Sequence, residues 1–232
     1  MTEIISNLIS LGLTNNEATL YLALSTRGDM TGYECAKITG ISRSNAYIAL
    51  AGLCENGAAY LVDGATQKYS PAPIKEFCAD KRRKFETVAA FLTENMPSPT
   101  APSEAYITIS GASAILDKMK NMIIACTERL YISAETMVLN ELSLELADAI
   151  NRKRKVVLMA DHDFDLDGAI KYNMTRTEGQ VRLIVDSLFV LTGDFAENCP
   201  CSCLFSASGT LVSLFKESMK NEIRLIELGE IK

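Results

Sequence analysis

The sequence predicts two domains: an α+β winged helix–turn–helix at the N-terminus and an α/β domain with a mixed sheet at the C-terminus. Three features of the 232-residue chain carry this prediction. Residues 31–70 hold two short helix patterns, a Gly turn and a hairpin pattern. Three prolines fall within six residues from Pro97, which no helix can accommodate. The remainder alternates strand and helix patterns, as α/β domains do.

These features set the expected boundaries. We expect the winged helix–turn–helix over 1–72, a linker or dimerisation helix over 73–96, a Pro-rich linker over 97–104, and an α/β effector-sensing or assembly domain over 105–232.

Composition excludes several classes of protein. An apolar fraction of 48% supports packed cores, which argues against global disorder. No apolar run reaches the length of about 18 residues that a membrane span needs, and the N-terminus lacks the pattern of a signal peptide. The seven scattered cysteines are typical of reduced thiols. We therefore expect a cytoplasmic protein with no membrane partner.

Charge is distributed unevenly along the chain. Residues 1–96 carry 9 Lys and Arg against 10 Asp and Glu, a net charge of −1, whereas the rest carries 14 against 19, a net charge of −5. A total of −6 argues against a general nucleic-acid coat, which would be basic. Specific DNA contact needs only a few well-placed cations and backbone N–H groups.

Capping boxes open the first two predicted helices. The pattern Thr-x-x-Glu, in which the two side chains satisfy free N–H groups reciprocally, occurs at 14–17 and again at 31–34. The first helix is expected to reach about residue 26, and the second to end at Gly40.

A third helix and a hairpin complete the predicted domain. Ser42 is the expected N-cap of a helix over 43–55. Strand patterns follow at 59–62 and 67–70, and the chain turns between them at 63–64. This order of elements is the one that places a helix in the major groove of DNA.

The first turns of the third helix are the expected DNA-contacting surface. Arg can bond bidentately to guanine and Asn to adenine, and Lys can contact phosphate. The alternatives are an exposed polar helix start without DNA, burial of Tyr47 at helical spacing from Leu50, and an ordinary surface lysine at position 68. The expected DNA-binding residues are Ser42, Arg43, Ser44, Asn45, Tyr47, Lys37 and Lys68.

A longer helix pattern begins at Pro73 and runs to about residue 95. Apolar residues recur in it at three- and four-residue steps, and a basic run at 81–84 interrupts them. The pattern predicts a helix that packs on one side and pairs with its twin in a homodimer. The basic run is either an exposed helix face or a contact with flanking phosphates.

The C-terminal patterns predict a mixed sheet with helices. The expected strands are 105–109, 129–133, 155–160, 181–186, 188–192 and 199–206, and the expected helices are 112–126, 137–151 and 210–220.

An acidic segment follows the predicted strand 155–160. Its spacing matches the opening of an EF-hand loop, but Met174 stands where the bidentate Glu is needed, and a strand pattern precedes it. We therefore predict no metal site. Such loops at the carboxyl ends of strands nevertheless host ligands in open α/β sheets. The candidate ligand-binding residues are Asp161, Asp163, Asp165 and Asp186.

Single residues add little catalytic chemistry. His162 is the only histidine, so no cage of several His ligands can form. Cys199, Cys201 and Cys203 alternate and would share one strand face. They can hold a metal, sense oxidants or pack as small buried side chains, and the last interpretation is favoured.

The N-terminal third resembles the winged-helix domain of the TrmB family of transcriptional regulators. The resemblance is carried by residues 11–18 (LGLTNNEA), 40–47 (GISRSNAY) and 68–73 (KYSPAP), and by the spacing of Leu50, Leu53 and Gly57. Membership implies a C-terminal effector domain with a phospholipase D-like fold.

The resemblance also implies that phospholipase D chemistry is absent. Those enzymes use a His nucleophile, a Lys two residues later and an Asp five residues after the Lys. Aligned on Asp186, this sequence has Gly179 and Val181 at the His and Lys positions, so no nucleophile stands there. We expect no catalytic residue and no cofactor.

The sequence thus predicts a sequence-specific, DNA-binding transcriptional regulator. Its expected partners are double-stranded DNA, a second copy of the chain and an unidentified small-molecule effector on the C-terminal domain. One alternative is an enzyme, phosphodiesterase-like or metal-dependent, whose active site lies in the C-terminal domain. Another is a winged helix that binds only protein.

Overall fold

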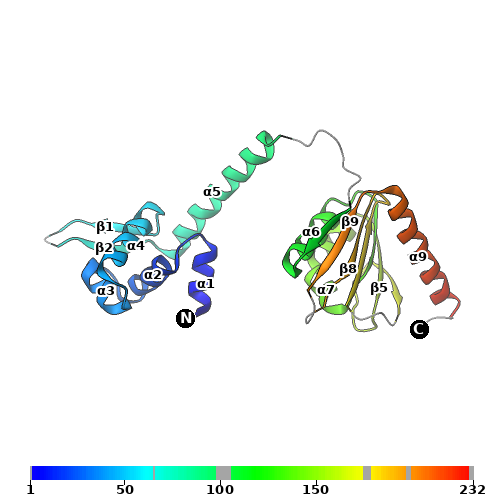
Figure 1. Cartoon of the computed structure of the whole chain (residues 1–232), viewed down its shortest axis with the longest axis horizontal. Coiled ribbons are helices and arrows are strands. Elements are labelled where there is room, and N and C mark those ends of the chain that lie inside the picture. Colours follow the sequence, from blue (N-terminus) through cyan, green and yellow to red (C-terminus); the bar gives the residue numbers. More distant parts are fainter. Residues whose placement is uncertain (1, 65, 98–105, 175–178, 197–199, 230–232) are drawn as a thin grey trace. The chain divides into compact units, whose positions relative to one another are not determined.

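The computed structural model of the chain describes residues 2–64, 66–97, 106–174, 179–196 and 200–229 (Figure 1). The chain divides into two compact units, Met1–Ser98 and Pro99–Lys232. Most of the expected Pro-rich linker, Ala65 of the hairpin turn and Cys199 lie outside the described residues. Over the ranges just given, no helix has the length and hydropathy needed to cross a membrane.

The first unit is a helical domain with a two-stranded wing. Thr14 and Thr31 form the two predicted capping boxes, and Gly40 ends α3 in the left-handed conformation. The order of elements confirms the predicted winged helix–turn–helix. The elements are α1 (Thr2–Ser10), α2 (Asn15–Arg27), α3 (Gly32–Thr39), α4 (Arg43–Glu55), β1 (Ala59–Val62), β2 (Lys68–Pro71) and α5 (Ile74–Asn95).

One apolar core contains residues of helices α1, α2, α3 and α4, of the wing and of the start of α5. Tyr21 connects α2 to the beginning of α5 in two ways. Its ring lies 5.9 Å from that of Phe77, and its hydroxyl donates a 2.8 Å hydrogen bond to the Ala72 carbonyl. These contacts fix where α5 leaves the domain, because Phe77 is buried.

Two glycines leave room for side chains where α4 packs against its neighbours. A Cβ on Gly52 would lie 2.1 Å from Oε1 of Glu17 on α2. A Cβ on Gly32 of α3 would lie 2.5 Å from the ring carbon Cε1 of Tyr47 on α4. A Cβ at either position would overlap the far end of the neighbouring side chain, which would have to move, so the observed packing uses the space that glycine leaves.

Most of α5 has no partner within its own unit. Phe77 is the buried residue of the predicted apolar stripe, whereas the side chains nearer the C-terminal end are between 47% and 75% exposed. These exposed apolar residues are Phe85, Val88, Phe91 and Leu92.

The second unit is a seven-stranded mixed sheet with helices on both faces (Figure 1). The strand order is β3-β9-β8-β7-β4-β5-β6; the β4–β5 and β5–β6 pairs are parallel and the others antiparallel. The elements are β3 (Ile107–Ser110), α6 (Ala112–Ile124), β4 (Arg129–Ser133), α7 (Thr136–Glu141), α8 (Ser143–Asn151), β5 (Lys155–Ala160), β6 (Ile170–Asn173), β7 (Gln180–Val185), β8 (Phe189–Asp194), β9 (Ser202–Ser206) and α9 (Gly209–Glu227).

The two faces of the sheet belong to different cores. Val181, Leu183 and Val185 of β7 pack toward α6, α7 and α8, whereas Ile184 packs toward α9. Arg182, also on the α9 side, makes bidentate contacts of 2.5 and 2.6 Å with Glu222 of α9. The side chains of this ion pair are only 14% and 23% exposed, so it fixes the position of α9 on the sheet.

The structure differs from the sequence prediction in four places. Helix α1 was not predicted, and α9 ends at Glu227, seven residues beyond the expected end at residue 220. The single helix expected over 137–151 is two helices, α7 and α8, because the chain bends at Leu142 so that this side chain is buried in the core. The strand β6, which follows the acidic loop, was not predicted, because its sequence IKYN lacks an alternation of apolar and polar residues.

The Gly52 crossing yields a stability prediction. Gly52→Ala should destabilise the first unit by about 1–3 kcal/mol, because the new methyl group overlaps the Glu17 carboxylate. Hydrogen exchange of the α2 and α4 amides would measure the loss. Gly209→Ala is the control, because that position in the first turn of α9 has open space around it. Equal or greater protection in Gly52→Ala would contradict the close crossing.

Candidate nucleic-acid interface

The helix–turn–helix consists of α3, a tight turn and α4. Gly40 ends α3 with φ 73°, and its N–H donates to the Ala36 carbonyl at 3.0 Å. Two residues later the Ser42 side chain caps α4 by accepting from the Asn45 N–H. The buried residues Ala46, Ala49, Leu50 and Leu53 hold one side of α4 in the core.

The leading end of α4 is exposed in its unit. Ser42, Arg43, Ser44 and Asn45 are all exposed, and the first turn carries no acidic residue. Free backbone N–H groups and the positive end of the helix dipole attract anions here. Arg43 adds a full positive charge. The surface suits contact with phosphates and with base edges.

Tyr33 is a neighbour of Arg43 that sequence reasoning did not identify. The Arg43 guanidinium lies 4.6 Å from the centroid of the Tyr33 ring, which is 48% exposed. This cation–π contact restricts Arg43 while leaving its N–H groups free for a ligand. The one sequence signal was an aromatic residue two positions after the N-cap Thr31, on the exposed side of α3.

The sequence left open whether Tyr47 is exposed for DNA contact or buried at helical spacing from Leu50, and the structure shows a residue that is partly exposed and partly buried. Its ring packs over Gly32, yet 48% of the residue is exposed. Lys37, in the last turn of α3, and Lys68, the first residue of β2, are both exposed.

The basic run on α5 is largely engaged with its own chain. Lys81 donates to Oδ1 of Asn56 at 3.2 Å, Arg82 pairs with Glu86, and Arg83 pairs with Asp80. These contacts favour an exposed, internally paired helix face over a phosphate-binding surface.

The acidic segment between β5 and β6 is largely exposed. Phe164 is buried in the core and anchors the loop, while Asp163 and Asp165 are exposed and Asp161 is half-buried. The segment then enters β6, which pairs in parallel with β5, so it does not continue as an EF-hand would. Within the described ranges, no three His, Cys, Asp or Glu side chains gather closely enough to hold a metal ion.

Asp186 lies at the opposite end of the sheet from the acidic loop. It follows β7, which runs antiparallel to β4, and so it lies beside the amino end of β4. The loop follows the carboxyl end of β5, which runs parallel to β4. Asp186 therefore cannot share one ligand site with Asp161, Asp163 and Asp165.

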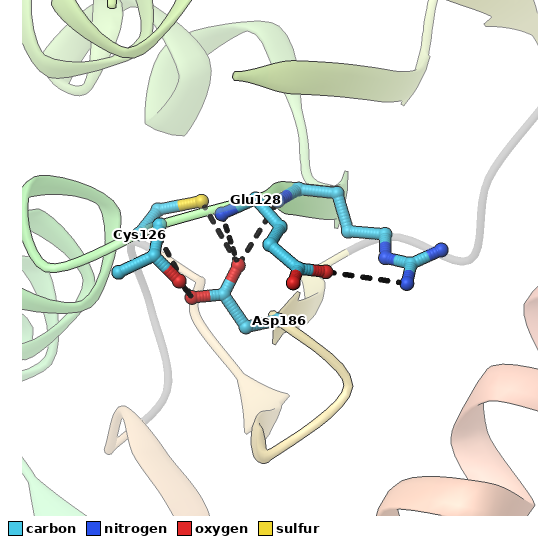
Figure 2. Close-up of polar contacts among 5 residues, drawn as sticks. Cys126, Glu128 and Asp186 are labelled. Carbon is cyan, nitrogen blue, oxygen red and sulfur yellow. Dashed lines mark hydrogen bonds and ion pairs between the residues drawn. The ribbon is translucent and has the colours of Figure 1, made fainter.

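The Asp186 carboxylate binds the backbone just before β4 (Figure 2). It accepts from the N–H groups of Thr127, Glu128 and Arg129 at 2.8–2.9 Å. It also accepts from the Thr127 hydroxyl at 2.8 Å and from the Cys126 thiol at 3.5 Å. These bonds tie the β7–β8 turn to β4.

The same turn places Asp186 in an unusual conformation. Asp186 and Ser187 both have positive φ, 52° and 57°, and the Leu188 N–H donates to the Val185 carbonyl. Two successive left-handed residues form a type I′ hairpin turn. The hydrogen bonds that the Asp186 carboxylate accepts offset the backbone strain. An acidic residue at position 186 therefore has a structural role.

The two positions that would hold the phospholipase D nucleophile and lysine are a buried glycine and a buried valine. The Gly179 N–H donates to the Glu135 carboxylate at 2.5 Å, and Val181 packs in the sheet core. Neither residue supplies a group that can attack or protonate a substrate.

The described cysteines are free thiols. Cys203 on β9 is buried in the core, and Cys201 packs against the same core. Burial raises the pKa of the Cys203 thiol to about 11, so it stays protonated. Cys199, the third member of the motif, lies outside the described residues.

Comparison with known proteins finds two matching family models. Residues 8–75 match the family described as sugar-specific transcriptional regulator TrmB, and residues 105–200 match the family described as transcriptional regulator TrmB, EBD N-terminal subdomain. A relative, the uncharacterized protein YrhO of Bacillus subtilis (strain 168), is 31% identical over 175 residues, 74% of this chain. The chain spans 62% of the length of that relative.

The solved structures that resemble this chain have low sequence identity to it. TrmBL2, described as an archaeal chromatin protein with a novel mode of DNA binding, is 18% identical with a TM-score of 0.47, over 95% of this chain and 97% of that one. NucT from Helicobacter pylori (11% identical, TM-score 0.43) and the phospholipase D family member Nuc from Salmonella typhimurium (15%, 0.41) each cover 50% of this chain, and 94% and 93% of their own.

The Asp186 contacts predict a pH-dependent contribution to stability. Burial raises the pKa of the Asp186 carboxyl, but the hydrogen bonds from Arg129, Thr127 and Glu128 outweigh it and hold that pKa well below its usual range. The stabilisation is therefore complete above the ordinary pKa of 3.8 and is lost as the pH falls toward the lower, folded-state value.

Asp186→Asn should lower the unfolding free energy of the second unit by about 2 kcal/mol at neutral pH, because backbone N–H groups lose a charged acceptor. Urea denaturation followed by circular dichroism measures this loss, which should shrink at a pH of about 2. Asp163→Asn, an exposed position in the same unit, is the control. A constant difference between Asp186→Asn and the natural protein across this pH range would refute the role.

Proposed function

Because this chain belongs to the TrmB family of transcriptional regulators, we propose that it binds operator DNA through α4 and regulates transcription in the cytoplasm. The observation that carries the proposal is the exposed leading end of α4, with Arg43 held beside free helix N–H groups. The residues we assign to DNA contact are Ser42, Arg43, Ser44, Asn45, Tyr47, Lys37 and Lys68, with Tyr33 positioning Arg43.

The charge distribution suits sequence-dependent binding. Arg43, Lys37 and Lys68 are the cations of the proposed surface, and the paired basic run on α5 contributes little. Few phosphate contacts give weak non-specific binding and a shallow dependence on salt. Specificity then depends on contacts between α4 and base edges.

The proposal describes a regulator without catalysis. The carboxylate of Asp186 is occupied by backbone N–H groups, and Gly179 and Val181 offer no reactive group. These features support a sensing or assembly role for the second unit. We place its effector at the carboxyl end of β5, where Asp161, Asp163 and Asp165 can accept hydrogen bonds from a polyhydroxylated ligand such as a sugar, the ligand class in the description of the matched family.

A homodimer through α5 completes the proposal. Exposed Phe85, Val88, Phe91 and Leu92 lie at helical spacing on a helix of 22 residues. A groove of about 520 Å³ beside the end of α1 is lined by Leu11, Phe85 and Val88 among others. Pairing two such helices would bury these side chains and place two α4 helices on one duplex.

Removing the Arg43 side chain tests the DNA contact. Arg43→Ala should weaken binding to the chain's own promoter DNA by about 1–3 kcal/mol, because the guanidinium contacts guanine or phosphate. Fluorescence anisotropy with labelled duplex measures the change. Arg83→Ala serves as the matched control, since Arg83 is paired with Asp80 on α5. If both variants bind as tightly as the natural chain, Arg43 has no such role.

Removing an apolar side chain from α5 tests the dimer. Phe85→Ser removes one ring from each copy, so the dimer should lose about 3 kcal/mol and its dissociation constant should rise roughly 100-fold. Analytical ultracentrifugation measures this dissociation constant directly. Leu228→Ser, at a residue 63% exposed after α9, should leave the dimer intact. A natural chain that stays monomeric at tens of micromolar would contradict the α5 dimer.

A further inference from the structure

The solvent-facing side of α4 is apolar along its middle. Ser44, Tyr47, Ile48 and Ala51 are exposed, and the pairs 44/47, 44/48, 47/51 and 48/51 are three or four residues apart, so the four form one strip along the helix. Ile48 is the most exposed of the large apolar residues of α4, at 70%. These four residues are uncharged; Arg43 precedes them on α4, and exposed Glu55 follows Ala51 by four residues.

Ile48 has no packing role in its own unit. The core side of α4 is already filled by Ala46, Ala49, Leu50 and Leu53. Ile48 is therefore held in water on a helix, where a β-branched residue is slightly unfavourable. A partner surface that removes it from water would gain the free energy of burying its methyl groups.

The surroundings of Ile48 suit a duplex. Arg43 precedes it by five residues, about one and a half turns, and is stacked on Tyr33. Lys37 on α3 and Lys68 on β2 are exposed. These three cations can contact phosphates that flank a groove, although exposed Glu34 also lies near Lys68. In the major groove, the apolar group that base edges offer is the C5 methyl of thymine.

We propose that Ile48 reads a thymine methyl group, so that each half-site of the operator carries a thymine facing the middle of α4. The inference rests on the proposed DNA-binding function and adds a specificity-determining residue to it. A serine at position 48 would keep the helix but lose the apolar contact. A valine would keep most of it.

Replacing thymine by uracil tests the proposal, because this change removes only the C5 methyl group. The full chain first selects its preferred duplex from a random pool. Each thymine of that duplex is then replaced in turn. For the natural chain, uracil at the contacted position of a single half-site should weaken binding about fourfold, which corresponds to about 0.8 kcal/mol for one buried methyl group.

Variants of the chain give the second arm of the test. Ile48→Ser should bind thymine and uracil duplexes equally well, and Ile48→Val should still prefer thymine. Ile38→Ser is the matched control: Ile38 is 41% exposed but lies on α3, away from the strip, so this variant should keep the preference. All three should unfold at the same temperature as the natural chain, because surface changes cost little.

The outcomes separate this inference from the proposed function. If the natural chain selects no DNA, both are wrong. If it selects DNA but no uracil position weakens binding, or if Ile48→Ser keeps the thymine preference, the inference alone is overturned. A loss of thymine preference confined to Ile48→Ser supports it.

Discussion

The close crossing of α4 with α2 and α3 is the constraint on which the proposed interface depends. Gly52 lets α4 approach Glu17, and Gly32 lets it seat Tyr47 on the start of α3. With these contacts made, four small or branched apolar residues face the core and the opposite side of α4 must face solvent. The exposed strip is thus a consequence of packing, and packing leaves it available to a ligand.

The winged helix was predictable because its signals are local. Two capping boxes, the αL glycine at position 40 and the Ser42 cap each lie within a few residues of the helix end that they define. The contact between Tyr33 and Arg43 was not predictable, because it joins two helices whose angle depends on the core. The same holds for Tyr47, whose half-buried state requires knowing that Gly32 lies beneath it.

In the second unit, strands with continuous apolar runs were predictable, whereas the short edge strand β6 was not. Strands β4 and β5 begin and end where the pattern places them, whereas β6 is an edge strand recognisable only from its pairing with β5. Asp186 was identified as a candidate ligand because the resemblance aligned it with a catalytic position. Its partners are backbone groups 57 to 59 residues away, which no local pattern reveals.

The most direct measurement of the central claim is methylation interference on a duplex that the chain selects. Methylation at guanine N7 fills the major groove, so binding should be blocked at guanines in two patches about one helical turn, roughly 10 base pairs, apart. That result would place α4 in the major groove on each half-site. Interference confined to adenine N3, which lies in the minor groove, or no interference at all, would contradict the account.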